Sequence, residues 1–154
     1  MNKRILLVLP KSEGGYWGKV RHGKAGLVGL SLPAVAALTP PEWQVTIHDS
    51  RVDPVNYDHD AALVGITAFS PDIPNAYEIA DNFRRKGIPV VMGGVHVSAR
   101  PDEALEHADS VVIGEAEDVW KSLLADLEAG KLQRIYHSDT YCDMQNMPYP
   151  RLDL

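Results

Sequence analysis

Two short apolar runs, each ending in glycine, constrain the fold of this chain more than any other part of its sequence. Residues 88–92 (IPVVM) are followed by Gly93-Gly94, and residues 110–113 (SVVI) are followed by Gly114. Both runs are too short for a helix and rich in β-branched residues, which predicts strands that are buried on both faces. A glycine after a strand allows the backbone to adopt φ > 0 or to approach a ligand without an intervening Cβ. Because open parallel sheets bind ligands at the carboxyl ends of their strands, we expect the function of this chain at these glycines.

The rest of the sequence alternates between strand and helix patterns. Further strands are predicted at 3–9, 43–48 and 61–69. The alternating polarity of 43–48 is typical of an edge strand. Helices are predicted after Ser31 as N-cap, from Ser70-Pro71-Asp72, from Pro101, and from Ala116 to Gly130. This order predicts a flavodoxin-like α/β fold, with a doubly wound parallel five-stranded sheet in the order 2-1-3-4-5 and helices on both faces. Residues 133–137 are compatible with one more short strand.

Size and composition predict one soluble globular domain. The chain has 154 residues, of which 45% are hydrophobic and 23% charged. We expect residues 1–140 to form the domain and the proline-containing residues 141–154 to be a linker. The net charge of −6 argues against a nucleic-acid surface. The apolar run at 5–9 is too short for a signal sequence or a membrane span, so a cytoplasmic location is expected. Cys142 is the only cysteine, which excludes an internal disulfide and a cysteine-ligated iron–sulfur cluster in this chain.

Residues 10–29 form a long segment with six glycines and no clean periodicity. Loops of this length inside a compact domain are usually binding loops or disordered, so we expect this one to be mobile in the free protein. A dinucleotide fingerprint requires glycine at position 13, where this chain has Glu13, and a helix directly afterwards. Nucleotide binding is therefore a weak alternative. The sequence offers no nucleophile–base pair, and the chain looks like a binding protein.

Polar residues near the predicted strand ends are candidates for ligand contacts. Thr67 is placed to hydrogen-bond a ligand amide, whereas the more frequent role for Ser70 is that of a helix N-cap. A lone histidine such as His96 is more often a hydrogen-bonding residue than a metal ligand. Glu115 either benefits from the N-terminus of the following helix or accepts hydrogen bonds from amide or ribose hydroxyl groups of a ligand.

The glycine pair Gly93-Gly94 has two interpretations, a tight connection without a ligand and an unobstructed ligand-binding edge. The second glycine-ended strand, at Gly114, favours the open edge. A bulky β-branched residue at Gly94 is then expected to weaken ligand binding and to leave the fold largely intact.

With these residues placed, the sequence resembles the N-terminal cobalamin-binding domain of cobalamin-dependent radical SAM enzymes. The resemblance spans nearly the whole chain and rests on the order and spacing of 29–36 (GLSLPAVA), 64–67 (VGIT), 90–96 (VVMGGVH) and 111–117 (VVIGEAE). The tail 147–154 (MPYPRLDL) is similar to the linker that leads into the radical SAM barrel. The resemblance implies a cobalamin-binding module for methyl transfer or cobalamin-assisted radical chemistry in a larger parent enzyme.

The resemblance also implies where cobalamin binds. The corrin ring is expected across the carboxyl edge of the sheet, with the nucleotide tail beside the sheet. The implied contacts are Lys11, Ser12, Gly14, Gly15, Thr67, Phe69, Ser70, Gly93, Gly94, Val95, His96, Gly114 and Glu115. The methionine-synthase type of domain has D-x-H-x-x-G after its first strand, with the histidine ligating cobalt from below. This chain has PKSEGG at 10–15, and the spacing of the later His22 does not nominate it, so no metal ligand is expected.

A second departure from the family is that the barrel, with its C-x-x-x-C-x-x-C motif, is missing from these residues. This chain is therefore not expected to cleave S-adenosylmethionine by itself, and an excised domain is the favoured interpretation. The parent enzyme is expected to supply the barrel as partner, an iron–sulfur cluster and S-adenosylmethionine. The alternative from another functional class is a fold relative that does not bind cobalamin and serves as a docking or regulatory domain.

Overall fold

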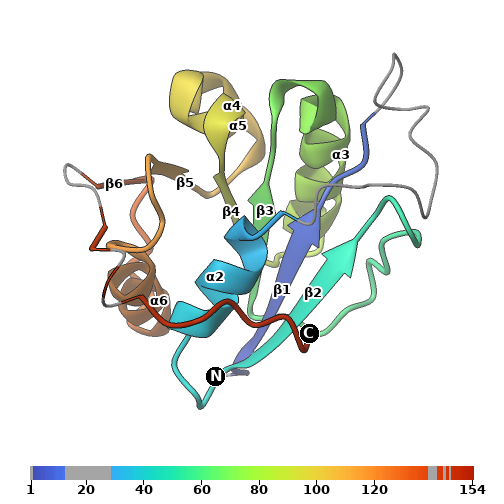
Figure 1. The fold of residues 1–154 in the computed structure, drawn as a ribbon. Helices are drawn as coiled ribbons and strands as arrows, with labels where there is room; N and C mark the ends of the chain where they lie inside the picture. Colours follow the sequence, from blue (N-terminus) through green and yellow to red (C-terminus); the bar gives the residue numbers. More distant parts are fainter. Residues whose placement is uncertain (1, 13–28, 139–141, 144, 146) are drawn as a thin grey trace.

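The computed structural model describes residues 2–12, 29–138, 142–143, 145 and 147–154. In this part of the chain, a six-stranded parallel sheet lies between two layers of helices (Figure 1). The strands are β1 Arg4–Leu9, β2 Gln44–Asp49, β3 Leu63–Thr67, β4 Val90–Gly93, β5 Ser110–Ile113 and β6 Ile135–His137. Their order is β2-β1-β3-β4-β5-β6, and every neighbouring pair is parallel.

This topology confirms the predicted parallel α/β fold, the predicted strand order and the edge position of β2. The sheet has six strands instead of five, and the additional one lies within residues 133–137, which were compatible with a short strand. The sixth strand, β6, pairs with β5, and Val111 lies opposite Ile135. Its three residues are too few for a clear periodic pattern in the sequence, so its pairing depends on the exposed edge that β5 offers.

The helices cover both faces of the sheet, as predicted. They are α2 Ser31–Leu38, α3 Ile73–Arg85, α4 Val95–Ala99, α5 Pro101–His107 and α6 Trp120–Glu128, and a 3-10 turn, η1, spans Ser70–Asp72. Helices α2 and α6 lie on one face of the sheet, whereas α3 and α5 lie on the other (Figure 1).

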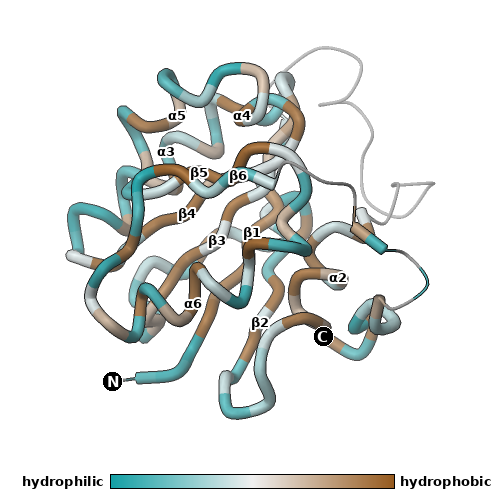
Figure 2. The backbone as a smooth tube through the Cα atoms, turned by 90° about the vertical axis from the view of Figure 1, so that its left-hand side faces the viewer, coloured by the Kyte–Doolittle hydropathy of each residue, from teal (hydrophilic) through white to brown (hydrophobic). Residues whose placement is uncertain are grey.

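The core has two halves because successive side chains of a strand point to opposite faces. In β1, Ile5 and Leu7 pack with the residues of α2 and α6, whereas Leu6 and Val8 pack with those of α3. All four are at most 3% exposed. Apolar segments accordingly run through the central strands, and the outer helices have mixed polarity (Figure 2). Sequence runs that are apolar at every position are typical of such doubly covered strands.

Several helix starts differ from the prediction. Ser31 is not the N-cap of α2, because Leu30 before it already has helical backbone angles and caps without a side-chain bond. Helix α6 starts at Trp120 instead of Ala116, and a turn closed by a 3.1 Å bond from the Val119 N–H to the Ala116 carbonyl precedes it. The short helix α4 after Gly94 was not predicted, because five residues show no helical periodicity.

Candidate functional site

The carboxyl ends of β3 and β4 meet at the edge of the sheet where ligand binding is expected from the sequence. The Ala68 N–H donates to the Gly93 carbonyl at 3.1 Å, and the His96 N–H donates to the Ala68 carbonyl at 3.3 Å. These backbone bonds hold residues 67–70 and 93–96 side by side. The predicted site residues in these two segments, Thr67, Phe69, Ser70, Gly93, Gly94, Val95 and His96, are therefore brought together.

Gly94 is packed against this connection instead of facing an open edge. A Cβ on Gly94 would lie 2.8 Å from the carbonyl oxygen and 2.9 Å from the nitrogen of Ala68, and 2.9 Å from Thr67 Oγ1. Its φ of 99° and ψ of 179° belong to a region that is essentially reserved for glycine. The expectation that a bulky residue at Gly94 leaves the fold intact is therefore wrong. Gly93 differs, because a Cβ there meets nothing closer than Val112 Cβ at 3.7 Å.

Two large apolar side chains are exposed beside these glycines. Phe69 follows β3 and is 56% exposed, and Val95 follows Gly94 and is 66% exposed. Large apolar side chains that are exposed together mark a surface for an apolar ligand or partner more often than scattered ones do.

Ser70 and His96 form a polar pair next to these apolar residues. His96 Nδ1 lies 3.0 Å from Ser70 Oγ. Its Nε2 is buried and makes no hydrogen bond within the described residues, and Glu103 Oε1 lies 3.5 Å away. Ser70 is not an N-cap, because η1 has no side-chain cap bond and the hydroxyl pairs with His96 instead. The interpretation of His96 as a hydrogen-bonding residue agrees with this contact. Over the described ranges, no group of three or more histidine, cysteine or acidic residues is placed to hold a metal ion.

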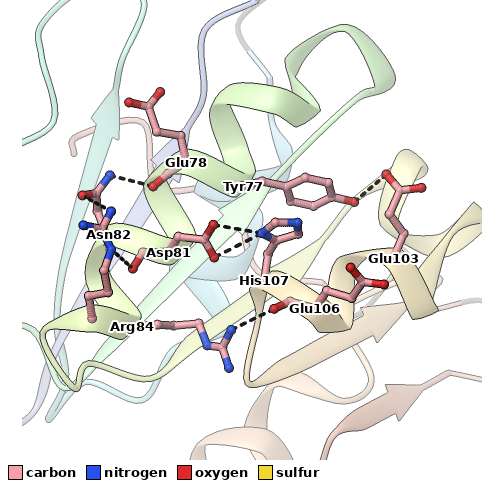
Figure 3. A network of polar contacts seen from close by, with 9 residues as sticks. Tyr77, Glu78, Asp81, Asn82, Arg84, Glu103, Glu106 and His107 are labelled. Carbon is pink, nitrogen blue, oxygen red and sulfur yellow. Dashed lines mark hydrogen bonds and ion pairs between the residues drawn. The ribbon is translucent and has the colours of Figure 1, made fainter.

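Glu103 is held by a network between α3 and α5 (Figure 3). The Tyr77 hydroxyl donates to Glu103 Oε1 at 3.1 Å, and Arg100 Nη2 lies 3.2 Å from Oε2. The Tyr77 hydrogen bond lowers the pKa of Glu103, desolvation opposes it, and His96 and Arg100 lower it further. Burial, together with the Glu103 carboxylate, raises the pKa of Tyr77. The ring of Tyr77 stacks on His107 with centroids 4.0 Å apart.

The end of β5 contacts the C-terminal tail. Gly114 has a φ of 80°, and its N–H donates to Ser98 Oγ on α4 at 3.0 Å. Glu115 Oε2 accepts a 2.8 Å hydrogen bond from the Cys142 N–H. Glu115 does not start a helix, because α6 begins at Trp120. The structure thus gives this predicted ligand contact a partner in the tail.

The first residues after β1 are anchored to the start of α3. The Lys11 N–H donates to Asn75 Oδ1 at 3.1 Å, and the Ser12 hydroxyl donates to Asp72 Oδ1. Asp72 and Asn75 are only 9% and 5% exposed, and they were not predicted as anchors from the sequence. The available signal was a pair of polar residues three apart, Asp72 directly before the amphipathic helix α3 and Asn75 in its first turn. Gly14, Gly15 and His22, and the predicted mobility of most of the loop, lie outside the described residues.

Comparison with known proteins identifies the family. Residues 29–124 match the family described as the B12 binding domain. This chain belongs to the B12-binding domain family. It is 41% identical over 116 residues to bacteriochlorophyllide d C-8(2)-methyltransferase of Chlorobaculum tepidum. It is 35% identical over 150 residues to bacteriochlorophyllide d C-12(1)-methyltransferase of the same organism.

These matches cover 75% and 96% of this B12-binding domain, but 26% and 32% of the two enzymes. The chain therefore spans about a quarter to a third of the length of the curated relatives it matches. A solved structure, the N-terminal domain of a hypothetical protein of Thermotoga maritima, is 24% identical and has a TM-score of 0.45, covering 55% of this chain and 73% of that chain.

The residues of the edge fit the cofactor that the family name implies. Cobalamin is a flat macrocycle with an apolar ring system and amide side chains. The edge of this B12-binding domain presents two exposed apolar side chains, Phe69 and Val95, beside the Ser70 hydroxyl. His96 is engaged through Nδ1, and its Nε2 is buried toward Glu103, so neither nitrogen is presented to a cobalt ion. No helix in the described part of this domain is long and apolar enough to cross a membrane.

The contact between the tail and Glu115 predicts a slowly reacting thiol. A hydrogen bond to Glu115, together with burial and the charge of that carboxylate, raises the pKa of Cys142 to about 11. Since the thiolate is the nucleophile, we expect alkylation by iodoacetamide at pH 8 to accelerate roughly tenfold in Glu115→Gln. Mass spectrometry of timed samples measures the rate. The distant substitution Glu42→Gln is the control, and equal rates in all three proteins would show that the tail does not lie at Glu115.

Proposed function

We propose that this B12-binding domain is the cobalamin module of a cobalamin-dependent radical SAM enzyme, and that this enzyme is a methyltransferase. The family match supports cobalamin as the ligand, and the names of the two relatives support methyl transfer. The observation that carries the proposal is the edge formed by the ends of β3 and β4, where two exposed apolar side chains, Phe69 and Val95, lie beside the Ser70 hydroxyl that pairs with His96. When bound, cobalamin supplies a cobalt centre that can carry a methyl group.

We assign different tasks to the candidate residues. Phe69 and Val95 would pack against the corrin, and the Thr67 and Ser70 hydroxyls would contact its amides. Gly94 would let the segment after β4 pack closely against Ala68, because there is no room for a side chain at this position. Lys11, Ser12, Gly14 and Gly15 would contribute from the first loop, and Gly93, His96, Gly114 and Glu115 would line the edge or support it.

The proposed domain division places the module at 1–140 and a linker at 141–154. The described tail residues contain no helix or strand. They touch the domain at Glu115 and at Pro33, whose carbonyl accepts a 3.0 Å hydrogen bond from the Arg151 N–H. The tail crosses the side of the domain on which α2 and α6 lie (Figure 1). In the parent enzyme it would lead to a radical SAM barrel with its iron–sulfur cluster and S-adenosylmethionine.

A spectroscopic titration with hydroxocobalamin tests the proposal. We expect saturable binding that is weaker than in a parent enzyme, because the sheet edge covers one face of the corrin. Apolar area left in water forgoes about 25 cal/mol per Å². Phe69→Asp places a charge on the apolar surface and is expected to weaken binding at least roughly tenfold.

The matched control is Ile135→Asp, which changes an exposed apolar residue at the opposite end of the parallel strands. Ile135→Asp is expected to bind like the unmodified chain. Equal affinities of Phe69→Asp and Ile135→Asp would place the corrin elsewhere. If hydroxocobalamin bound neither the unmodified chain nor the same domain within its parent, the docking or regulatory alternative would be favoured.

A further inference from the structure

The hydroxyl of Ser70 has a defined hydrogen-bonding direction, because His96 stands between it and Glu103. His96 Nδ1 lies 3.0 Å from Ser70 Oγ, and its Nε2 points toward Glu103 Oε1 at 3.5 Å. Nε2 is buried and has no other polar partner in the described chain. Whether Glu103 is ionised therefore decides which ring nitrogen of His96 carries hydrogen when the imidazole is neutral.

Glu103 is an ionised carboxylate. Tyr77 donates a 3.1 Å hydrogen bond to Oε1, and the Arg100 guanidinium lies 3.2 Å from Oε2. Both contacts stabilise the charged form, and the pKa of Glu103 is lowered, chiefly by the Tyr77 hydrogen bond. An ionised carboxylate accepts hydrogen bonds and donates none. The nitrogen that faces it, Nε2, is the one that carries hydrogen.

The remaining assignments follow from the number of protons available. A neutral imidazole with hydrogen on Nε2 has a lone pair on Nδ1, so Nδ1 accepts. Ser70 must then donate its single hydroxyl hydrogen to Nδ1 of His96. At the exposed edge of the sheet, Ser70 therefore presents the lone pairs of its oxygen and no donor hydrogen.

We propose that Ser70 is a specificity-determining acceptor that selects a ligand with an N–H group, namely a corrin with amide side chains, over the same ring with carboxylates. The inference rests on the proposed function and names the chemistry of the ligand rim at that site. An amide N–H of the corrin can donate a hydrogen bond to a lone pair of Ser70 Oγ. A carboxylate offers no donor hydrogen and brings negative charge toward the lone pairs of Ser70, with the Glu103 carboxylate behind them.

His96 and Glu103 act in this proposal as positioning residues. Without His96, the Ser70 hydroxyl rotates freely and can donate to a carboxylate as well as accept from an amide. Without the negative charge of Glu103, the proton of the His96 ring is free to move to Nδ1, which would reverse the direction of the Ser70 hydrogen bond.

The test compares two corrins, cobinamide with its amides and cobyrinic acid with carboxylates, by spectroscopic titration at one ionic strength. The unmodified chain is expected to prefer cobinamide. The preference should fall roughly tenfold in Ser70→Ala and in His96→Asn, and Ser70→Thr, which keeps the hydroxyl, should retain it. Comparing this ratio between each variant and the unmodified chain cancels the general repulsion of acids by a chain of net charge −6, because that repulsion is nearly the same in all of them.

Nitrogen NMR of the histidine rings gives a second readout that needs no corrin. The His96 ring, assigned by its loss in His96→Asn, should carry hydrogen on Nε2 at neutral pH and should lose this preference in Glu103→Gln. Hydrogen on Nδ1 in the unmodified chain would overturn the inference. An unchanged corrin preference in Ser70→Ala would overturn it as well and leave the proposed function standing. Failure of the unmodified chain to bind either corrin would overturn the inference, and the hydroxocobalamin titration then decides whether the proposed function falls with it.

Discussion

Replacing Gly94 with alanine is expected to destabilise the fold by roughly 3 kcal/mol or more. Two independent costs add. The backbone angles of Gly94, φ 99° and ψ 179°, are strained for any residue with a Cβ. The new Cβ would also lie 2.8 Å and 2.9 Å from backbone atoms of Ala68, which are fixed by hydrogen bonds to Gly93 and His96. Backbone atoms cannot rotate away as the end of a flexible side chain can.

Urea denaturation followed by circular dichroism measures this cost, and the neighbouring glycine supplies the control. Gly93 has no positive φ, and a Cβ there would make only an ordinary contact with Val112 at 3.7 Å. We expect Gly93→Ala to change the free energy of unfolding by less than about 1 kcal/mol. If the two variants were equally stable, the close approach of Gly94 to Ala68 would not exist in solution.

Replacing Trp120 with alanine is expected to cost roughly 3–5 kcal/mol of unfolding free energy. Trp120 is 3% exposed, and its Nε1–H donates to Thr39 Oγ1 at 2.9 Å. Its ring lies over Gly65 in the central strand, where a Cβ would be 3.8 Å from Trp120 Cη2 and 2.8 Å from Leu7 Cδ2. One side chain thus joins α6, the end of α2 and β3, and its loss leaves a cavity between them.

Thermal and urea denaturation of a graded series separate the contributions of packing and hydrogen bonding. Trp120→Phe keeps most of the apolar ring and loses the bond to Thr39, so we expect roughly 1–2 kcal/mol. Tyr149→Ala removes an aromatic side chain that is 96% exposed and should have almost no effect. A cost below about 1 kcal/mol for Trp120→Ala would mean that the helix layer collapses onto Gly65 without leaving a cavity.

The architecture was predictable because it depends on patterns that lie within single segments. The apolar runs around Val64, Val91 and Val112 are hydrophobic at consecutive positions, which only a strand covered on both faces requires. The alternation of such runs with helices then restricts the order of a parallel sheet. The family resemblance, carried by segments in the same order, is confirmed as a B12-binding domain by the match over residues 29–124.

The structure brings the predicted site residues that follow β3 and β4 together at the sheet edge, but their individual contacts were not predictable from the sequence. Ser70 was interpreted as an N-cap because serine before a helix usually is one, and its real partner, His96, is 26 residues away. Glu115 was interpreted either as favoured by a helix N-terminus or as an acceptor of ligand hydrogen bonds, and in the structure it accepts a bond from Cys142, 27 residues away. The binding of cobalamin by these residues stays a prediction.

The sequence by itself determined which segments become strands, that the strands are parallel and covered on both faces, and which edge holds the glycines. These properties follow from local hydrophobic periodicity and from the backbone freedom of glycine. Only the tertiary structure decided that Gly94 is packed against Ala68, that Trp120 fills the space above Gly65, and that Glu103 orients His96 and Ser70. Each of these contacts joins residues that are distant in the chain, and their distances are set by how the strands and helices pack together.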